Sequence, residues 1–422
     1  MNDSPVDPFL EPRLPALPRD RDDDQAPAAV AARLALAERS AGRALPRLAG
    51  EPVPYSEARG NVENIVGFAQ VPVGLAGPLV CDTTSGRAEC YLPLATNEGA
   101  LVASVSRGTR LLAAGGGARA RVVREGLTQN PVLVYRDARA AGDALELARG
   151  SFERFAKLVA GTTNHGRLVE VRPSTIGRRL VLSLVFTTGD AIGINMAARA
   201  TDLCMRDLAE RTGALEAWVH GQDVEKRANS RALVEGRGRS VVCDVVVPRA
   251  DLERIARTTP EALKRAIDTY RVGFAELGTH NWTVQSANVI AALFVACGQD
   301  VAYLVECATG QLDLDVTESG DLYAGVWLPS MLVGTVGGGS GKGTAAECLA
   351  LLGCTARQFE GPGAANRFAE LIAAAVLAGD LSLMAAFCTS EFVAAHERLG
   401  RNRPPGGPPE RRDAKPAGEG DA

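Results

Sequence analysis

The feature that most constrains the fold is an apolar strand pattern that runs into a glycine turn and then into a long amphipathic helix. The strand pattern is RLVLSLVF (179–186), the turn is TTGDAIGIN (187–195), and the helical pattern follows it. This order places backbone N–H groups at a helix N-terminus, which can bind a phosphate or a nucleotide. Gly189 and Gly193 are four residues apart with an acid between them, so the GxGxxG fingerprint is absent. From these residues alone, a nucleotide site and an ordinary tight turn both stay open.

Both helical and strand patterns occur along the rest of the chain. SVVCDVVVP (240–248) reads as a strand, whereas Gly and Pro in VPVGLAGPL (71–79) predict a loop with tight turns. The last third is predicted to be helical apart from the loop GTVGGGSGKG (334–343), with Gly379 ending one helix and Asp380 capping the next. That glycine loop could approach a ligand closely or could only connect two helices.

Composition excludes several classes of protein. The chain has 422 residues and a net charge of -4, which argues against non-specific nucleic-acid binding. No run of about 18 uninterrupted apolar residues occurs, so we expect no membrane span. The N-terminus lacks the apolar core of a signal peptide, and we expect a cytoplasmic protein. Nine scattered cysteines without a Cys-x-x-Cys pair predict reduced thiols and no metal site.

A few residues could carry chemistry, each with a plainer alternative. Lys226 is one of five lysines among 46 basic residues, in a chain that otherwise uses arginine. Together with Glu98 and Asp300 it could form a proton relay, although a charged run is more often a solvated surface. His396 follows an apolar helical pattern near the C-terminus, where a histidine is more often a surface residue.

The order of the motifs is more specific than any one of them. The chain contains, in sequence, ENIVGFAQVPVGLAGPL, LPLATNEGALVASVSRG, GDAIGINM, EKRANSRALVEGRGRSVVCDVVVP, ACGQD, GTVGGGS and LSLMAA...AAH, from Glu63 to His396. Seven motifs in this order closely resemble 3-hydroxy-3-methylglutaryl-CoA (HMG-CoA) reductases, in the soluble catalytic region of the NADPH-using class I form.

The resemblance implies the roles of individual residues. The catalytic residues that it implies are Glu98, Lys226, Asp300 and His396. The cofactor-binding residues that it implies for NADPH, with NADH still open, are Arg154, Asp190, Gly193, Asn195, Gly337, Gly338 and Gly339. The implied reaction delivers two hydrides in succession, through a hemithioacetal and an aldehyde, to give an alcohol and free coenzyme A. A compact ammonium suits the oxyanion formed on the thioester carbonyl, and a histidine suits protonation of the departing thiolate.

The residues expected to bind the substrate depart from the family pattern. The candidates are Gln129, Glu225, Arg227 and Asn288, and Gln129 stands where the family has an arginine for the substrate carboxylate. Losing that contact would cost a dicarboxylic substrate on the order of 1.5 to 3 kcal/mol per hydrogen bond. Reduction of HMG-CoA to mevalonate is the default function. The alternatives are reduction of another acyl-CoA or carrier-bound thioester in a specialised biosynthetic pathway, and an inactive acyl-CoA- or nucleotide-binding homologue.

The expected architecture also follows the resemblance. We expect a disordered start and helical region at 1–62, and a large helical α+β domain at 63–130 plus 233–400. A small ferredoxin-like α+β domain for NADP(H) is expected at 131–218, with a connecting catalytic loop at 219–232. Residues 401–422 are expected to be a disordered tail. The resemblance further implies a homodimer or higher homo-oligomer with active sites shared between chains.

Overall fold

The computed structural model describes residues 12–20, 23–359 and 363–389. The α-helices in these ranges are α1 Pro27–Ala41, α2 Leu101–Ala114, α3 Ala138–Arg149, α4 Phe152–Ala160, α5 Ile194–Thr212, α6 Ser230–Glu235, α7 Arg249–Ala256, α8 Pro260–Leu277, α9 Ser286–Ala296, α10 Leu304–Cys307, α11 Gly343–Leu351 and α12 Ala364–Cys388. The short 3-10 helices are η1 Tyr55–Ala58, η2 Val301–Tyr303 and η3 Ala356–Gln358. The strands are β1 Val73–Thr83, β2 Gly86–Ala95, β3 Ala118–Gln129, β4 Val132–Val134, β5 Arg167–Ile176, β6 Arg179–Thr187, β7 Glu216–Trp218, β8 Gly238–Val247, β9 Gln311–Val316 and β10 Leu322–Met331.

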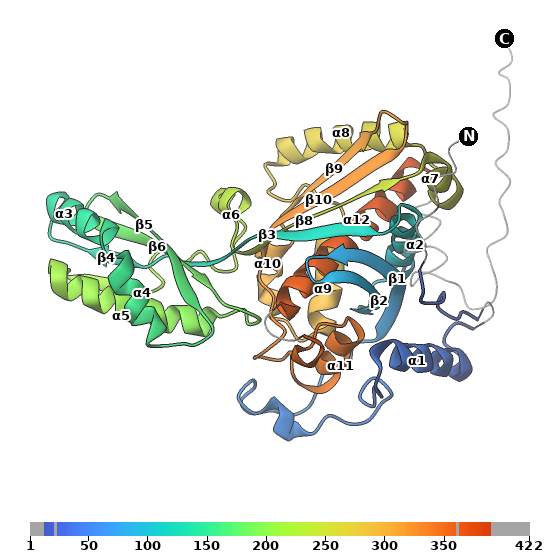
Figure 1. The fold of residues 1–422 in the computed structure, drawn as a ribbon, viewed down its shortest axis with the longest axis horizontal. Coiled ribbons are helices and arrows are strands. Elements are labelled where there is room, and N and C mark those ends of the chain that lie inside the picture. The colour runs from blue at the N-terminus through green and yellow to red at the C-terminus, as the bar shows by residue number, and fades with distance from the viewer. Residues whose placement is uncertain (1–11, 21–22, 360–362, 390–422) are drawn as a thin grey trace, which may run out of the picture.

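The protein has a larger and a smaller part joined through one continuous sheet (Figure 1). The strand order along the described sheet is β7-β4-β6-β3-β8-β10-β9, with β1 and β2 beside β3 and with β5 beside β6. The first part of β3 pairs with β8 from Arg119 to Gly126, and its last residues, Leu127 to Gln129, pair with β6. A single strand therefore connects the two parts, and its last residue, Gln129, lies where they meet.

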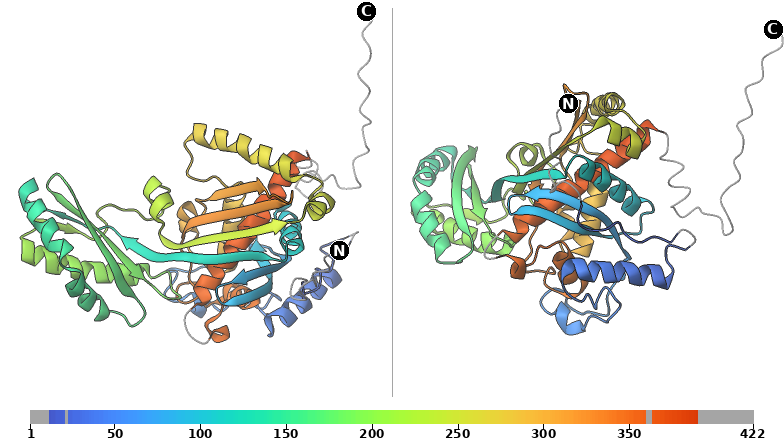
Figure 2. Two further views of the ribbon diagram at one scale, coloured as in Figure 1. Left: turned by 45° about the horizontal axis from the view of Figure 1, so that its top comes forward. Right: turned by 45° about the vertical axis from the view of Figure 1, so that its right-hand side comes forward.

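The smaller part consists of β4, β5, β6 and β7 with helices α3, α4 and α5. The helices lie against one face of these antiparallel strands, as the right-hand view of Figure 2 shows. Every residue of β6 from Leu180 to Phe186 is buried, because this strand is central in the small sheet. The predicted sequence of strand, glycine turn and helix is thus confirmed as β6, the turn at 188–193 and α5.

Helix α12 forms the core of the larger part. It packs across β3, β8 and β10 and against α2 and α9 (Figure 1). Its length and apolar composition would suffice to cross a membrane, but 83% of its most apolar window is buried inside the protein. Close crossing with α2 depends on Gly108, where a Cβ would lie 1.8 Å from the carbonyl oxygen of Ala378. The apolar character of α12 is therefore explained by its position in the core.

Three expectations about secondary structure are wrong. The segment 71–79 is not a loop from Val73 onward, where β1 begins, and a register shift between Ala76 and Leu79 accommodates its Gly and Pro. The last third is not only helical, since it supplies β9 and β10. Gly379 does not end a helix, because α12 continues through it. Its hydrogen side chain instead leaves room for Gln285, whose Oε1 would lie 2.7 Å from a Cβ there.

Asp380 consequently caps a helix other than the predicted one. It lies inside α12, fully buried, and its Oδ1 accepts the backbone N–H groups of Val284 and Gln285 at 3.3 and 2.7 Å. These residues directly precede α9, so the carboxylate lies at that helix's N-terminus. Its Oδ2 has no hydrogen-bond partner among the described residues. Burial raises the pKa of Asp380 from 3.8 to about 7, against the lowering effect of the two N–H donors.

This buried carboxyl predicts a pH-dependent stability. The folded protein holds the proton more tightly than the unfolded chain, so stability is lost as pH rises from the ordinary pKa towards the folded one. Between about pH 5 and about pH 8 the loss from this group is roughly 3 kcal/mol at most. We expect Asp380→Asn, which cannot ionise, to lose correspondingly less stability over this interval in urea unfolding. The exposed helical Asp143→Asn is the control and should follow the wild type, and equal losses for Asp380→Asn and wild type would contradict the account.

Candidate active site

Lys226 lies in the loop between β7 and α6, beside the loop that follows α9. Its Nζ is 3.2 Å from Asp300 Oδ2 and 5.0 Å from the centre of the Tyr303 ring. The side chains of Lys226 and Asp300 are 44% and 45% exposed. Asp300 is held because its Oδ1 accepts the backbone N–H of Ala302 at 3.0 Å, which caps η2. A compact ammonium is thereby fixed at an accessible place between a carboxylate and an aromatic face.

A buried ion pair anchors the backbone of Lys226. This residue has a φ of 58°, which is uncommon outside glycine, and its N–H donates to the carboxylate of Glu306. Glu306 is 1% exposed and accepts both of its other hydrogen bonds from Arg237 Nη1, at 3.0 and 3.1 Å. Burial raises the pKa of Glu306, while the charge of Arg237 opposes the rise. The backbone of Lys226 is thus held by a buried carboxylate, which is itself paired with a buried guanidinium.

Glu225 joins this buried pair to the end of β3. Its Oε1 lies 3.3 Å from Arg237 Nη2 and accepts Gln129 Nε2 at 3.2 Å, and its Oε2 accepts the hydroxyl of Tyr303 at 3.3 Å. Burial and the charge of Glu225 both raise the pKa of Tyr303, which keeps its proton to donate. Gln129 is 1% exposed. Its amide N–H is therefore directed at Glu225, inside the protein.

Glu98 forms a separate pair with Asn288. Asn288 Nδ2 donates to Glu98 Oε2 at 2.8 Å, and both residues are exposed. Asn288 is in the first turn of α9, whereas Asp300 follows that helix, which is about 16 Å long at 11 residues. Within one chain the Glu98 and Lys226 pairs thus lie towards opposite ends of α9. The expected group of three therefore consists here of an ion pair and a separate hydrogen-bonded pair.

The turn before α5 contains three of the expected cofactor residues. Gly193 has a φ of 84° at the N-terminus of α5, and a Cβ there would lie 2.4 Å from Thr188 Cγ2. Asn195 is exposed in the first helical turn. The carboxylate of Asp190, however, faces the protein, where it accepts the backbone N–H groups of Gly363 and Ala365 at the start of α12. Of the three residues, Asn195 therefore presents a side chain to solvent.

The second glycine loop, 334–343, packs against the turn before α5 and against the loop that follows α9. Gln299 fixes its start, because the Gln299 amide exchanges hydrogen bonds with Gly334 N–H at 3.0 Å and Gly334 C=O at 2.9 Å. Gly337 and Gly338 have φ values of 79° and 53°, and no described atom lies within 4 Å of where their Cβ atoms would be. Gly339 instead touches Gly298. An extended ligand could therefore approach the backbone of this loop closely, which fits a dinucleotide.

The remaining expected residues lie on the surface or outside the described ranges. Arg154 on α4 forms a two-nitrogen contact with Asp207 on α5 and is 59% exposed. Arg227 forms an ion pair with Asp223 four residues earlier. His396 lies outside the described residues, as does the predicted tail at 401–422.

Sequence reasoning did not identify Arg237, Glu306, Tyr303 or Gln299. Glu306 could have been suspected, since it is the one acid in the apolar run YLVECA (303–308). An acid in such a run is seldom fully buried without a partner. Nothing in the local sequence connects it to Arg237, which lies 69 residues earlier.

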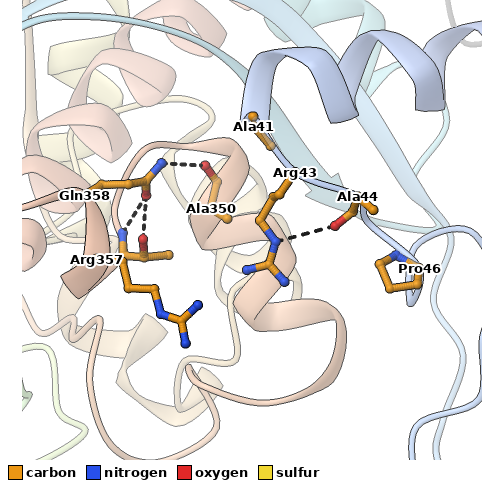
Figure 3. Close-up of a pocket in the computed structure, with 9 residues that line it drawn as sticks. Ala41, Arg43, Ala44, Pro46, Ala350, Arg357 and Gln358 are labelled. Carbon is orange, nitrogen blue, oxygen red and sulfur yellow. Dashed lines mark hydrogen bonds between the residues drawn. The ribbon is translucent and has the colours of Figure 1, made fainter.

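A cavity of about 510 Å³ lies between the end of α1 and the end of α11, in a region with none of the expected site residues (Figure 3). Arg43 and Arg357 line it, and the Gln358 amide donates to the carbonyl of Ala350 at 3.2 Å. Arg43 follows the C-terminus of α1, where a cation is favourable without any ligand, and Arg357 lies in the short helix η3.

Comparisons with known proteins identify the family of this arrangement. The family model described as hydroxymethylglutaryl-coenzyme A reductase matches residues 29–401. The 3-hydroxy-3-methylglutaryl-coenzyme A reductase of Haloferax volcanii is 40% identical over 376 residues, covering 88% of this chain and 93% of that protein. The protein of the same name from Pyrococcus abyssi is 37% identical over 371 residues, covering 86% and 90%.

A solved structure agrees in fold. The class II 3-hydroxy-3-methylglutaryl-CoA reductase from Streptococcus pneumoniae, bound to NADPH in open conformations, gives a TM-score of 0.68 at 21% identity. The match covers 84% of this chain and 96% of that one. At this identity the likeness concerns the fold alone.

Proposed function

The chain belongs to the hydroxymethylglutaryl-coenzyme A reductase family, and from this membership we propose that it reduces HMG-CoA to mevalonate and free coenzyme A with NADPH. The observation that carries the proposal is the Lys226–Asp300 ion pair, fixed at an accessible place by the buried Arg237–Glu306 pair. Reduction of a thioester places negative charge on the carbonyl oxygen, and a preorganised cation stabilises that charge.

Lys226 is the cation in this proposal. Its ammonium donates to the developing oxyanion, and Asp300 and the Tyr303 ring keep it oriented. Arginine would spread the charge over a planar fork and cannot release a proton near neutrality. Glu98 supplies a proton to the alkoxide and is oriented by Asn288. We assign protonation of the departing thiolate to His396.

The two glycine segments would hold the cofactor. Bound NADPH supplies the hydride. The backbone at Gly337 and Gly338 leaves room for a dinucleotide, and Asn195 in the first turn of α5 is exposed to one. Arg154 lies on the surface of the smaller part, where it could attract the 2′-phosphate by exchanging its partner Asp207.

A second candidate substrate is an acyl thioester without a distal carboxylate, and one observation favours it. Gln129 is buried and donates to Glu225, so no charged fork is offered where the family's carboxylate-binding arginine is expected. A thioester without a distal carboxylate would lose less binding free energy than HMG-CoA when this arginine is missing. Arg227, the other candidate cation, is already in an exposed ion pair with Asp223.

The function is tested by assaying NADPH oxidation and free thiol together over a panel of acyl-CoA thioesters. With HMG-CoA we expect two NADPH oxidised for each coenzyme A released, and mevalonate as the product. A clear preference for an acyl-CoA without a carboxylate would move the assignment to the second candidate. Absence of turnover with every thioester, despite binding of NADPH, would instead indicate an inactive homologue.

We further propose a homodimer of the cytoplasm in which each active site uses two chains. Support comes from the half-exposed Lys226–Asp300 pair and from the separate, exposed Glu98, which lies towards the other end of α9. A second copy related by a two-fold axis could bring its Glu98 beside Lys226 of the first chain.

Mixing two inactive variants tests this arrangement. Glu98→Gln and Lys226→Ala each remove one residue, and a mixed dimer would contain one intact site if the two residues come from different chains. Co-refolded protein should then recover roughly a quarter of the wild-type rate, from statistical pairing. Arg227→Lys mixed with wild type is the control for the mixing procedure. No recovery in a protein shown by light scattering to have exchanged subunits would place both residues in one chain.

A further inference from the structure

Both glycine segments are attached to one buried arginine on β8. Arg239 is 2% exposed. Its Nη2 donates to the carbonyl of Gly189 in the turn before α5, and its Nη1 donates to the carbonyl of Val333 at 2.9 Å, just before the second glycine loop. Its Nε donates to the side chain of Asn366 in the first turn of α12. One side chain thus holds three segments that are far apart in the sequence.

Asp190 fastens the same three segments to one another. Its backbone carbonyl accepts the N–H groups of Thr335 and Val336 at 2.8 and 3.3 Å. Its carboxylate accepts the N–H groups at the start of α12, as described above. The contact is close, since a Cβ on Gly334 would lie 2.8 Å from the backbone nitrogen of Ile192. The turn before α5 and the second glycine loop therefore form one packed unit, with Arg239 at its centre.

Arginine is the side chain that this position requires. Its planar fork serves three acceptors in different directions, whereas a lysine ammonium is a single point on a flexible stem. Burial lowers the pKa of Arg239, and the charges of Glu125 and Asp190 oppose this. Glu125 also accepts the N–H of Thr188 at 3.3 Å, so it holds the same turn from β3. The charges that oppose the effect of burial thus come from the turn before α5 and from the neighbouring strand β3.

We propose that Arg239 is a positioning residue that holds both glycine segments in the single arrangement that binds the cofactor. This inference rests on the proposed function for the identity of the ligand. Because Arg239 is buried and its nitrogens are hydrogen-bonded within the protein, it would act through the two segments and not by contact with the ligand. It fixes the distance between the exposed backbone of Gly337 and Gly338 and the N-terminus of α5. The two segments are therefore already ordered in the free protein, and binding the cofactor does not have to order them.

The test combines hydrogen exchange of the ligand-free protein with steady-state kinetics. The variant Arg239→Lys keeps a cation beside Glu125 and Asp190 but reaches fewer acceptors, so it should fold while it loosens the two segments. We expect amide exchange to rise together at 188–194 and 334–339, with exchange in β8 and β10 unchanged. The KM for NADPH should rise about tenfold or more, while the KM for the thioester and kcat stay within about twofold.

Arg119→Lys is the matched control. It lies on neighbouring β3, where Arg119 pairs at the surface with Asp244 of β8 at 2.9 Å, and it should alter neither loop. Faster exchange across the whole sheet, a change in only one loop, or an unchanged KM for NADPH would overturn the proposal. If wild type oxidised no NADPH with any thioester, the proposed function would fail, and the exchange measurement alone would still decide whether Arg239 couples the two loops.

Discussion

The ion pair between Arg237 and Glu306 is the interaction on which the candidate active site depends. Both side chains are at most 3% exposed, so the pair is removed from water. A buried pair adds little net stability, but removing one partner leaves a costly unpaired charge, so the arrangement is specific. Glu306 uses this fixed position to hold the backbone of Lys226 in a conformation with positive φ. The pair thereby determines where the ammonium points.

The cofactor side of the site is organised by a second buried arginine, which hydrogen-bonds to neutral acceptors. Arg239, two residues from Arg237 on β8, holds the two glycine segments and the start of α12. Arg237, just before β8, therefore supports the Lys226 side of the site, and Arg239, within β8, supports the cofactor side. Helix α12 lies behind both, and through Asp380 it also holds the N-terminus of α9, where Asn288 contacts Glu98.

Local patterns predicted those parts of the fold whose residues interact with near neighbours. The strand β6 and helix α5 followed from apolar periodicity. Lys226 was singled out by the family resemblance, in a chain where lysine is rare. The prediction failed where tertiary packing overrides a local signal. Gly379 resembles a helix stop but makes room for Gln285, and Gly and Pro in 71–79 are absorbed by a bulge in β1. Glu306 and Arg237 could not be paired from sequence, because they are 69 residues apart and their contact exists only in the folded chain.

The central claim is that the compact ammonium of Lys226 acts on the reacting carbonyl, and kcat of Lys226→Arg tests it most directly. The control is Arg227→Lys, which exchanges the same two residue types one position later. Comparing the two variants separates the effect of the position from the effect of the residue type. The account predicts that Lys226→Arg loses roughly 100-fold or more in kcat at an unchanged melting temperature, while Arg227→Lys stays within about threefold. A Lys226→Arg enzyme with the wild-type kcat would contradict the account.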